Sequence, residues 1–457
     1  MQYKDALQAM RSFFNSGATL SYAFRKKQLL ALRSTVLNYE KEISAALYTD
    51  LKKSAEESYA TETGLFLAEI NTAIRKLHDW MQPKSVSSNL VNLPSTNKIY
   101  RDPLGVTLII APWNYPFQLL MIPLVGAIAG GNCALVKPSE LAPATANVID
   151  MILSETFPEE YVKTVQGDGA ELVPAMMKNF RFDHVFYTGS IAVGRSIYQM
   201  AAADLVPVTL ELGGKSPAIV EEDANLAVAA RRIAMGKFIN AGQTCVAPDY
   251  VLVHSNVKTK FMGLLKKAIS DFYSEDPSAS YDYCKIINIR RLDKMVSYLN
   301  QGKITHGGSY NRENLYMSPT IMEDVSMDAP LMTEEIFGPI LPVFGFDNPT
   351  EAYSIIDRNP NPLAFYLFTN SSKAESEWIS RFRFGGGCVN NAIWQFGNHH
   401  LPFGGVGSSG MGGYHGKYTF ETFTRPKPVM KTPNWFDPSI KYPPFKGKLK
   451  LFKWLIR

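Results

Sequence analysis

Two short segments carry the residue types needed for nucleophilic catalysis. Cys245 lies in the segment 238–247, FINAGQTCVA, where small residues flank its thiol at the end of an apolar, helix-like run. Glu211 lies upstream in the segment 210–217, LELGGKSP. A thiol can bond covalently to a substrate carbonyl carbon, and a carboxylate nearby can take up a proton. Taken singly, a free cysteine is more often a small buried hydrophobe and a turn glutamate is more often structural, so the pair needs further support.

Two other segments could hold an anionic cofactor. Gly189 and Ser190 follow the strand-like residues 184–187 and open a helix-like stretch, where backbone amides could bind a diphosphate. A tight turn between a strand and a helix also needs glycine for purely structural reasons. Lys137 and Glu140 likewise follow an apolar run, where they could bind ribose hydroxyls or form an exposed charged turn.

Several other chemistries find no support in the sequence. The seven histidines and four cysteines show no zinc-ligand spacing, so we expect no catalytic metal. No Gly-x-Ser-x-Gly segment is present to provide a serine nucleophile. The segment 405–410, GVGSSG, has the letters of a dinucleotide-binding loop but follows Pro402 instead of a strand.

The elements that would position these residues alternate along most of the chain. Residues 1–80 show apolar positions at helical spacing. Short apolar runs separated by helix-length amphipathic segments follow at 106–110, 134–136, 162–165, 184–187, 206–210, 218–220, 251–254, 340–346 and 365–369. Strands joined by crossover-length helices predict parallel α/β sheets. Two consecutive units of this kind predict two domains, with Cys245 at the cleft between them.

The composition is typical of a folded protein from a reducing compartment. The chain has 457 residues, of which 46% are hydrophobic, enough for two or three domains. The four cysteines are widely separated, and neither a secretory signal nor a run of about 18 apolar residues is visible, so we expect a cytoplasmic location. Residues 441–457 hold six basic residues and no acid, and they account for the whole net charge of +5. A nucleic-acid partner is therefore not expected.

Seven ordered motifs resemble those of the aldehyde dehydrogenase superfamily. Between about residue 20 and residue 430 they are PWNYPF at 112–117, KPSE at 137–140, TGS at 188–190, LELGGK at 210–215, the Cys245 segment, EEIFGP at 334–339 and LPFGGV at 401–406. The segments QTCVAPDY at 243–250 and SGMGGYHGK at 409–417, together with the short N-terminus, resemble the class 3 branch of fatty and aromatic aldehyde dehydrogenases.

The resemblance implies an α/β fold with two Rossmann-like parallel domains and a small β bridging or oligomerisation unit. Residues 1–80 and 103–210 would form the NAD(P)-binding domain, and residues 211–392 the catalytic domain. The bridging segments would be 81–102 and 393–430, followed by a basic amphipathic tail at 431–457. A homodimer is implied as well.

The resemblance also implies a role for each site residue. Cys245 would form a thiohemiacetal and then a thioester, Asn114 would donate a hydrogen bond to the oxyanion, and Glu211 would activate the hydrolytic water. Glu335 is a candidate second base. NAD, or alternatively NADP, would bind to Lys137, Glu140, Gly189, Ser190, Glu335 and Phe337. The candidates for the wall of the aldehyde pocket are Trp113, Tyr115, Trp394, Phe396 and His415.

The implied function is NAD(P)-dependent oxidation of medium- or long-chain aliphatic or aromatic aldehydes to carboxylates. Two alternatives stay open at this point: transfer of the acyl group to coenzyme A, and a catalytically silent, membrane-associated scaffold. Residues 441–457 mix lysines with large apolar residues, which predicts weak peripheral contact with the inner face of an anionic membrane. This tail is too short to span a bilayer.

Overall fold

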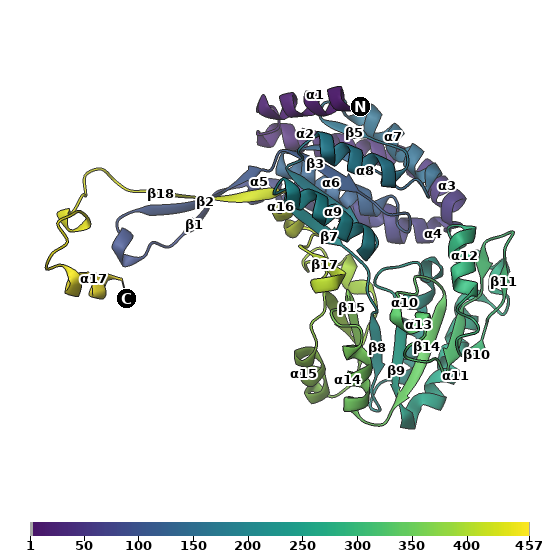
Figure 1. The fold of residues 1–457 in the computed structure, drawn as a ribbon. Helices are drawn as coiled ribbons and strands as arrows, with labels where there is room; N and C mark the ends of the chain where they lie inside the picture. Colours follow the sequence, from purple (N-terminus) through teal and green to yellow (C-terminus); the bar gives the residue numbers. More distant parts are fainter. Residues whose placement is uncertain (1–2, 457) are drawn as a thin grey trace.

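The computed structural model describes residues 3–456 and places most of them in two units, each built on a mainly parallel sheet that helices flank (Figure 1). The first, six-stranded sheet has the order β17-β7-β6-β3-β4-β5. Only β17 runs antiparallel to its neighbour. The strands of this sheet are β3 (Val106–Ile110), β4 (Cys133–Lys137), β5 (Val162–Thr164), β6 (His184–Thr188), β7 (Val208–Glu211) and β17 (Gly410–Met411).

Helices connect and cover this first sheet. The crossovers are α6 (Gln118–Gly130), α7 (Pro143–Thr156), α8 (Gly169–Asn179) and α9 (Ile191–Ala203). The N-terminal helices α1 (Lys4–Asn15), α2 (Tyr22–Asn38), α3 (Glu40–Leu51), α4 (Ala55–Ser58) and α5 (Gly64–Met81) pack on the same unit. All of α6 is buried, which explains why its sequence is apolar on every side.

The second sheet has seven strands in the order β10-β13-β14-β9-β8-β15-β16. They are β8 (Pro217–Val220), β9 (Tyr250–His254), β10 (Lys303–His306), β13 (Thr320–Glu323), β14 (Ile340–Phe346), β15 (Ala364–Phe368) and β16 (Gly386–Val389). The helices of this unit are α10 (Leu226–Phe238), α11 (Ser255–Tyr273), α12 (Ile289–Val296), α13 (Pro330–Thr333), α14 (Pro349–Asp357) and α15 (Ser372–Arg381). A small hairpin pairs β11 (Tyr310–Asn311) with β12 (Tyr316–Met317). Each sheet has its own hydrophobic core.

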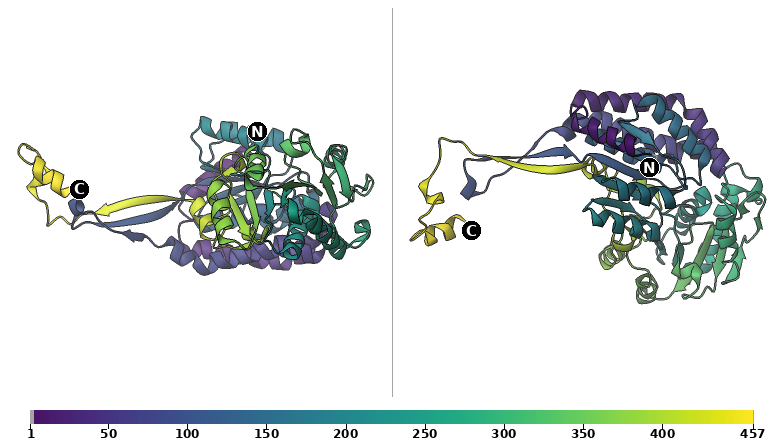
Figure 2. Two further views of the ribbon diagram at one scale, coloured as in Figure 1. Left: turned by 90° about the horizontal axis from the view of Figure 1, so that it is seen from below. Right: turned by 45° about the horizontal axis from the view of Figure 1, so that its top comes forward.

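A third, antiparallel sheet extends away from the body as an arm, with the C-terminal residues at its far end (Figures 1 and 2). Its order is β1-β2-β18, with β1 (Lys84–Val86), β2 (Thr96–Pro103) and β18 (Thr424–Lys431). The helix α16 (Lys417–Thr422) precedes β18 and packs on α6. The last helix, α17 (Leu449–Leu455), is exposed. Within residues 3–456, we find no helix with the length and hydrophobicity needed to cross a bilayer.

Candidate active site

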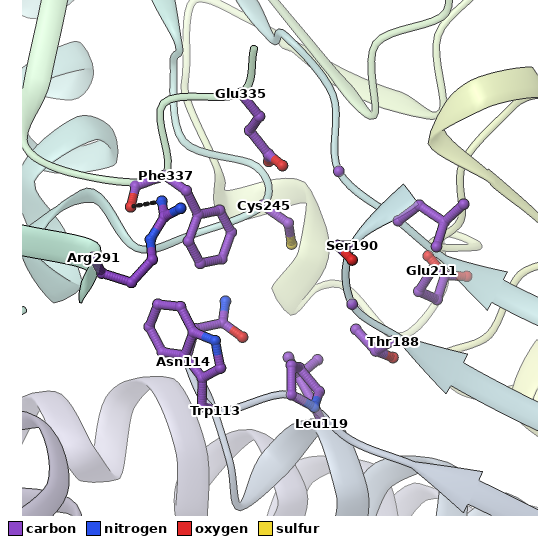
Figure 3. A pocket seen from close by; sticks show the side chains of 14 residues that line it. Trp113, Asn114, Leu119, Thr188, Ser190, Glu211, Cys245, Arg291, Glu335 and Phe337 are labelled. Atoms are coloured by element: carbon purple, nitrogen blue, oxygen red, sulfur yellow. Dashed lines mark hydrogen bonds between the residues drawn. The ribbon is translucent and has the colours of Figure 1, made fainter. Parts of the chain in front are cut away.

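A cavity of about 300 Å³ brings together side chains from both units (Figure 3). Asn114 comes from the loop between β3 and α6, and Glu211 from the end of β7. Cys245 comes from the segment between α10 and β9, and Glu335 from the loop after α13. Side chains that lie far apart in the sequence therefore face one enclosed space.

An unusual backbone path carries the chain from α10 to Cys245. Asn240, Ala241 and Gly242 all have positive φ angles, of 52°, 50° and 73°. A Cβ atom at Gly242 would lie 2.3 Å from the Gly338 carbonyl oxygen, so only glycine fits there. Such strained stretches persist when surrounding contacts hold them, and here Tyr366 Oη donates to the Val246 carbonyl oxygen at 2.5 Å.

The side chain of Gln243 fixes the loop further. Its Nε2 donates to the carbonyl oxygens of Asn240 and Lys285, both at 3.0 Å, and its Oε1 accepts from the Ile287 amide at 3.0 Å. Gln243 is fully buried, so these bonds exchange with no water. Gln243 belongs to the Cys245 motif, but this role depends on contacts with Lys285 and Ile287 that only the fold shows.

The surroundings of Cys245 disfavour the thiolate form of its side chain. Burial raises its pKa to about 12, and the neighbouring carboxyl groups of Glu335 and Glu211 act in the same direction. Since the thiolate is the nucleophile, the thiol must pass its proton to a base before it can attack. Glu211 and Glu335 line the same cavity and are the acceptors available among the described residues.

Glu211 is a buried carboxyl group whose oxygens meet no donor in the described structure. Its exposed fraction is 3%, and neither Oε1 nor Oε2 accepts a hydrogen bond from residues 3–456. Burial alone raises its pKa well above the ordinary value of 4.5. A raised pKa makes the carboxylate a stronger proton acceptor than an exposed one, which suits a general base.

Asn114 is also buried, with an exposed fraction of 2%. Its Nδ2 donates to the Gln243 carbonyl oxygen at 3.0 Å, which aligns the amide with the Cys245 loop. An amide nitrogen carries two hydrogens, so the second can be donated into the cavity.

The loop that carries Glu335 and Phe337 rests on buried charges. Lys215 Nζ donates to Asp249 Oδ2 at 2.6 Å and to the Glu334 carbonyl oxygen at 3.0 Å. Burial raises the pKa of Glu335 to about 8, with a further contribution from Asp249. A Cβ atom at position 213 would lie 1.9 Å from Glu335 Oε2, so the glycine there makes room for this carboxyl group.

Arg291 is a further lining residue that the sequence analysis missed. Its Nη2 donates to the carbonyl oxygens of Ile336 at 3.1 Å and Phe337 at 3.2 Å. The φ angle of Phe337 is 51°, and Arg291 holds this left-handed turn in place. The supporting residues Lys215 and Asp249 belong to the motifs at 210–215 and 243–250. Arg291 belongs to no motif of the sequence, because only the fold brings α12 to the cavity.

A second cavity, of about 590 Å³, continues from the first along the ends of the strands of the first sheet. Trp113, Thr188, Gly189 and Ser190 line both cavities. Ser190 caps α9 by accepting from the Val193 amide, as expected for a strand, a tight turn and a helix. At the far end of this second cavity, Lys137 is buried and forms an ion pair with the partly exposed Glu140.

This groove suits an elongated dinucleotide. Carboxyl groups lie at both ends, at Glu140 and Glu335, where ribose hydroxyls need acceptors. Gly189 and the N-terminus of α9 lie between them, where a diphosphate needs amide donors. A Cβ atom at Gly169 would lie 3.2 Å from Lys137 Nζ, so glycine keeps that end open.

The predicted aromatic pocket residues separate into three places. Tyr115, Phe396 and His415 line a small cavity that also contains Cys245. Trp113 lines the groove instead, with its ring 5.3 Å from that of Phe337. Trp394 lines neither cavity: it stacks on Phe396 and is 49% exposed. Burial lowers the pKa of His415 to about 4, so this residue contributes a neutral ring to the wall.

Known proteins match this chain along nearly its whole length. Residues 1–429 match the model of the aldehyde dehydrogenase family. The 4,4'-diaponeurosporen-aldehyde dehydrogenase of Staphylococcus aureus is 45% identical over 97% of this chain and 96% of that protein. The dimeric NADP-preferring aldehyde dehydrogenase of Rattus norvegicus is 41% identical over 97% of this chain and 98% of that protein.

The fold agrees with these matches. A substrate-bound structure of the Staphylococcus aureus aldehyde dehydrogenase has a TM-score of 0.97 and 44% identity, with 99% of each chain covered. An indole-3-acetaldehyde dehydrogenase solved with NAD+ has a TM-score of 0.84 and 26% identity, covering 94% of this chain and 88% of that one. The chain therefore belongs to the aldehyde dehydrogenase family, is related to its family 3 members, and is an oxidoreductase that oxidises aldehydes.

Proposed function

We propose that Cys245 is the covalent acceptor in NAD- or NADP-dependent oxidation of aldehydes to carboxylates. The observation that carries this proposal is the meeting of Cys245, Asn114 and the unpartnered Glu211 in one enclosed cavity, at the inner end of a groove suited to a dinucleotide. Relatives include an NADP-preferring enzyme and one solved with NAD+, which supports both cofactors.

The first half-reaction makes the aldehyde carbon tetrahedral. Cys245 gives its proton to a neighbouring carboxylate and its sulfur bonds to the carbonyl carbon, while the carbonyl oxygen becomes an alkoxide. The Asn114 amide and the Cys245 backbone N–H donate hydrogen bonds to that oxygen. NAD or NADP, which Lys137, Glu140 and Glu335 would hold, would supply the acceptor for the hydride that leaves the same carbon. As the alkoxide re-forms a carbonyl, the substrate remains on Cys245 as a thioester.

The second half-reaction releases the product. Glu211 removes a proton from a water molecule, and the resulting hydroxide bonds to the thioester carbon. The carbon–sulfur bond then breaks, Cys245 leaves as a thiolate, and the carboxylate product forms. Because the carboxyl oxygens of Glu211 have no hydrogen-bond partner among residues 3–456, no described side chain competes with the water for them. This favours hydrolysis over transfer of the acyl group to coenzyme A.

The wall of the cavity supports large apolar aldehydes as substrates. Tyr115, Phe396 and Phe403 lie beside Cys245 and present aromatic surface to an aliphatic chain or an aromatic ring. A relative from Staphylococcus aureus is named for the oxidation of 4,4'-diaponeurosporen-aldehyde. We therefore propose medium- or long-chain aliphatic or aromatic aldehydes.

A steady-state survey tests this assignment. Aldehydes of increasing chain length and aromatic aldehydes are compared with NAD and with NADP, in the natural protein and in Cys245→Ser. We expect kcat/KM to rise with apolar size and Cys245→Ser to be inactive. Full activity of Cys245→Ser would refute the covalent step, and acyl-CoA formation in saturating coenzyme A would show the transferase reaction instead.

We further propose a homodimer that contacts membranes weakly. A named relative is dimeric, and the arm offers exposed strands for pairing. Beyond the arm, Trp435, Tyr442, Phe445 and Trp454 are exposed beside lysines, as in segments that bind the inner surface of an anionic membrane. Co-sedimentation of the full chain and of residues 1–440 with anionic vesicles tests this. Equal recovery of the two proteins in the supernatant would contradict it.

A further inference from the structure

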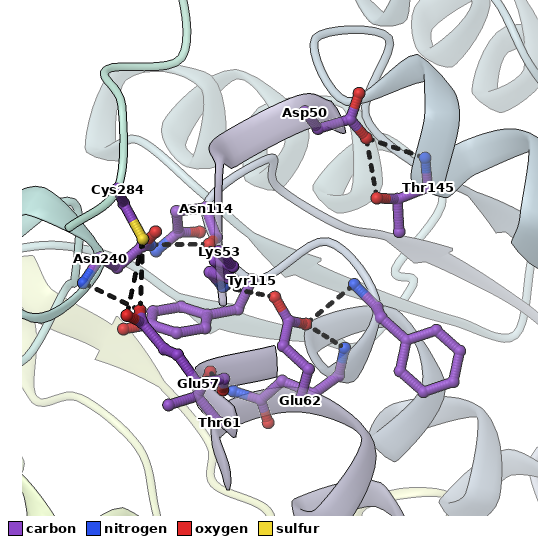
Figure 4. A network of polar contacts seen from close by, with 12 residues as sticks. Asp50, Lys53, Glu57, Thr61, Glu62, Asn114, Tyr115, Thr145, Asn240 and Cys284 are labelled. Atoms are coloured by element: carbon purple, nitrogen blue, oxygen red, sulfur yellow. Dashed lines mark hydrogen bonds and ion pairs between the residues drawn. The ribbon is translucent and has the colours of Figure 1, made fainter. Parts of the chain in front are cut away.

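A fully buried ion pair lies beneath the loop that carries Asn114, outside the proposed chemistry (Figure 4). Lys53 Nζ lies 2.6 Å from Glu62 Oε1, and both side chains have no exposed surface. The pair comes from the short segment between α3 and α5. Burying two charges is costly, so a pair in such a position calls for a reason beyond stability.

Lys53 holds the main chain of Asn114 directly. Its Nζ donates to the Asn114 carbonyl oxygen at 3.2 Å and lies 3.9 Å from the centre of the Tyr115 ring. The same carbonyl oxygen accepts from Asn240 Nδ2 at 2.8 Å. The main chain of Asn114 is thus fixed from two sides, by the N-terminal segment and by the Cys245 loop.

Glu62 holds the helix that follows Asn114. Its Oε2 accepts from the amides of Phe117 at 3.1 Å and Gln118 at 2.9 Å. These amides open α6, which has no side-chain cap of its own. A carboxylate that binds free amides at a helix N-terminus fixes the first turn. Since Lys53 neutralises this carboxylate, Glu62 caps α6 without adding net negative charge close to the oxyanion.

The local helix geometry presents Glu62 to this position. Residues Tyr59–Thr63 form a π-helix between α4 and α5, and Glu62 lies within it. An extra residue per turn rotates the following side chains relative to an α-helix, by about 100°. Single π-turns of this kind are frequent at functional sites, where they redirect one side chain.

The same segment also supports the Cys245 loop. Glu57 Oε1 accepts from the amide of Asn240 at 3.0 Å, at the start of the left-handed stretch. Asn240 in turn donates to the carbonyl oxygens of Asn114 and Gln243. Contacts from residues 53–62 therefore reach both partners of the proposed oxyanion site, although none of these residues lines the cavity.

We propose that Lys53 and Glu62 are positioning residues for the oxyanion donor Asn114. Lys53 fixes the main chain at Asn114 itself and Glu62 fixes the start of the helix that follows, so that the side-chain amide hydrogen points at the oxygen of the tetrahedral intermediate. This inference rests on the role proposed above for Asn114.

The test is a double-mutant cycle with a charge-balanced pair of substitutions. Lys53→Met together with Glu62→Met removes both contacts without leaving a buried unpaired charge. We expect kcat to fall about tenfold, because small displacements of a catalytic group have effects of this size or larger. Hydrolysis of an aryl ester should fall by a similar factor, since it needs the oxyanion site but no hydride transfer. In an Asn114→Ala background, the same double substitution should cause no further loss.

Asp50→Asn is the matched control. Asp50 lies at the end of α3, just before that segment, and caps α7 by accepting from the Thr145 amide at 2.8 Å and from its hydroxyl at 2.7 Å (Figure 4). This buried carboxylate does for α7 what Glu62 does for α6, but α7 does not carry Asn114. Its loss should lower Tm and leave kcat unchanged.

Each outcome has a distinct meaning. Equal losses of kcat in the natural and Asn114→Ala backgrounds, or a tenfold loss in Asp50→Asn, would show a merely structural role and overturn the inference. Full activity of Asn114→Ala would overturn the proposed role of Asn114 itself. If the double variant does not fold, Lys53→Arg replaces it in the cycle. A loss of kcat that occurs only when Asn114 is present supports the inference. A loss of kcat of the same size in the Asn114→Ala background opposes it.

Discussion

Replacing Glu211 by glutamine should separate the two half-reactions. Glutamine keeps the shape of the side chain but cannot accept the proton of the hydrolytic water. General bases contribute about 10²–10⁴-fold to a rate, or roughly 3–5 kcal/mol of activation free energy. Because the Glu211 side chain makes no hydrogen bond within residues 3–456, the substitution breaks no side-chain hydrogen bond, so this loss should fall on thioester hydrolysis.

Stopped-flow absorbance of reduced cofactor measures the effect. With saturating aldehyde and NAD, Glu211→Gln should give a rapid burst equal to the concentration of active sites, followed by a steady state about 10²–10⁴-fold slower than that of the natural protein. The burst marks acylation of Cys245, and the slow phase marks hydrolysis. Loss of the burst together with the steady-state rate would refute the assignment of Glu211 to the second half-reaction.

Thermal unfolding at several pH values tests whether this slow phase reflects misfolding. The pKa of Glu211 is raised in the folded state, so its carboxyl group stabilises the fold at low pH, and this contribution is lost as pH rises from about 4.5 towards the folded value. A glutamine side chain does not ionise, so the variant does not lose stability in this way. The difference in Tm between Glu211→Gln and the natural protein should therefore shift in favour of the variant as pH rises over the same interval. As a control, Glu69→Gln changes a buried carboxyl group that is hydrogen-bonded to Gly416 and Thr419, and it should lower Tm without producing a burst.

Three further results are expected. Asn114→Ala should lower kcat by about 10²–10³-fold, which is the usual effect of removing one oxyanion donor. The Kd for NAD, measured by fluorescence titration, should not change. A change in this Kd without a change in kcat would contradict the role of Asn114 as an oxyanion donor. Without cofactor, the rate at which iodoacetamide alkylates Cys245 should rise about tenfold per pH unit between roughly pH 7 and pH 10. The reason is that the thiolate fraction grows with pH as long as the pH is below the thiol pKa of about 12. A rate that is already maximal at neutral pH would instead show that the resting thiol is ionised. Glu140→Gln should raise kcat/KM for NADP relative to NAD, since it removes the carboxylate that repels a 2′-phosphate, and an unchanged ratio in steady-state assays would place the adenosine ribose elsewhere.

Much of the fold could be predicted from local patterns. All nine predicted strand segments overlap strands of the two parallel sheets, because buried parallel strands are continuously apolar. The strands that the sequence analysis missed are short or exposed. For example, β18 contains Pro426 and Pro428, which argue against a strand, yet β18 lies at the edge of the arm, where a proline need not donate to a neighbour.

A site residue could be predicted only where it belongs to a motif that the sequence shows. Cys245, Glu211 and Asn114 belong to three such motifs, and the fold brings them into one cavity. Trp394 was expected at the pocket wall, but its side chain turns to the surface, and no local signal sets that direction. Lys53 and Glu62 gave no signal either, since their function depends on contacts with residues far along the chain.

Peptide mass spectrometry of a trapped intermediate tests the central claim most directly. Glu211→Gln is mixed with an aldehyde and NAD, quenched in acid after the burst and digested. The thioester mechanism predicts that the peptide containing Cys245 gains the mass of the acyl group, and that Cys245→Ala in the same background gains none. An acyl group on another residue, or turnover without any acylated peptide, would contradict it.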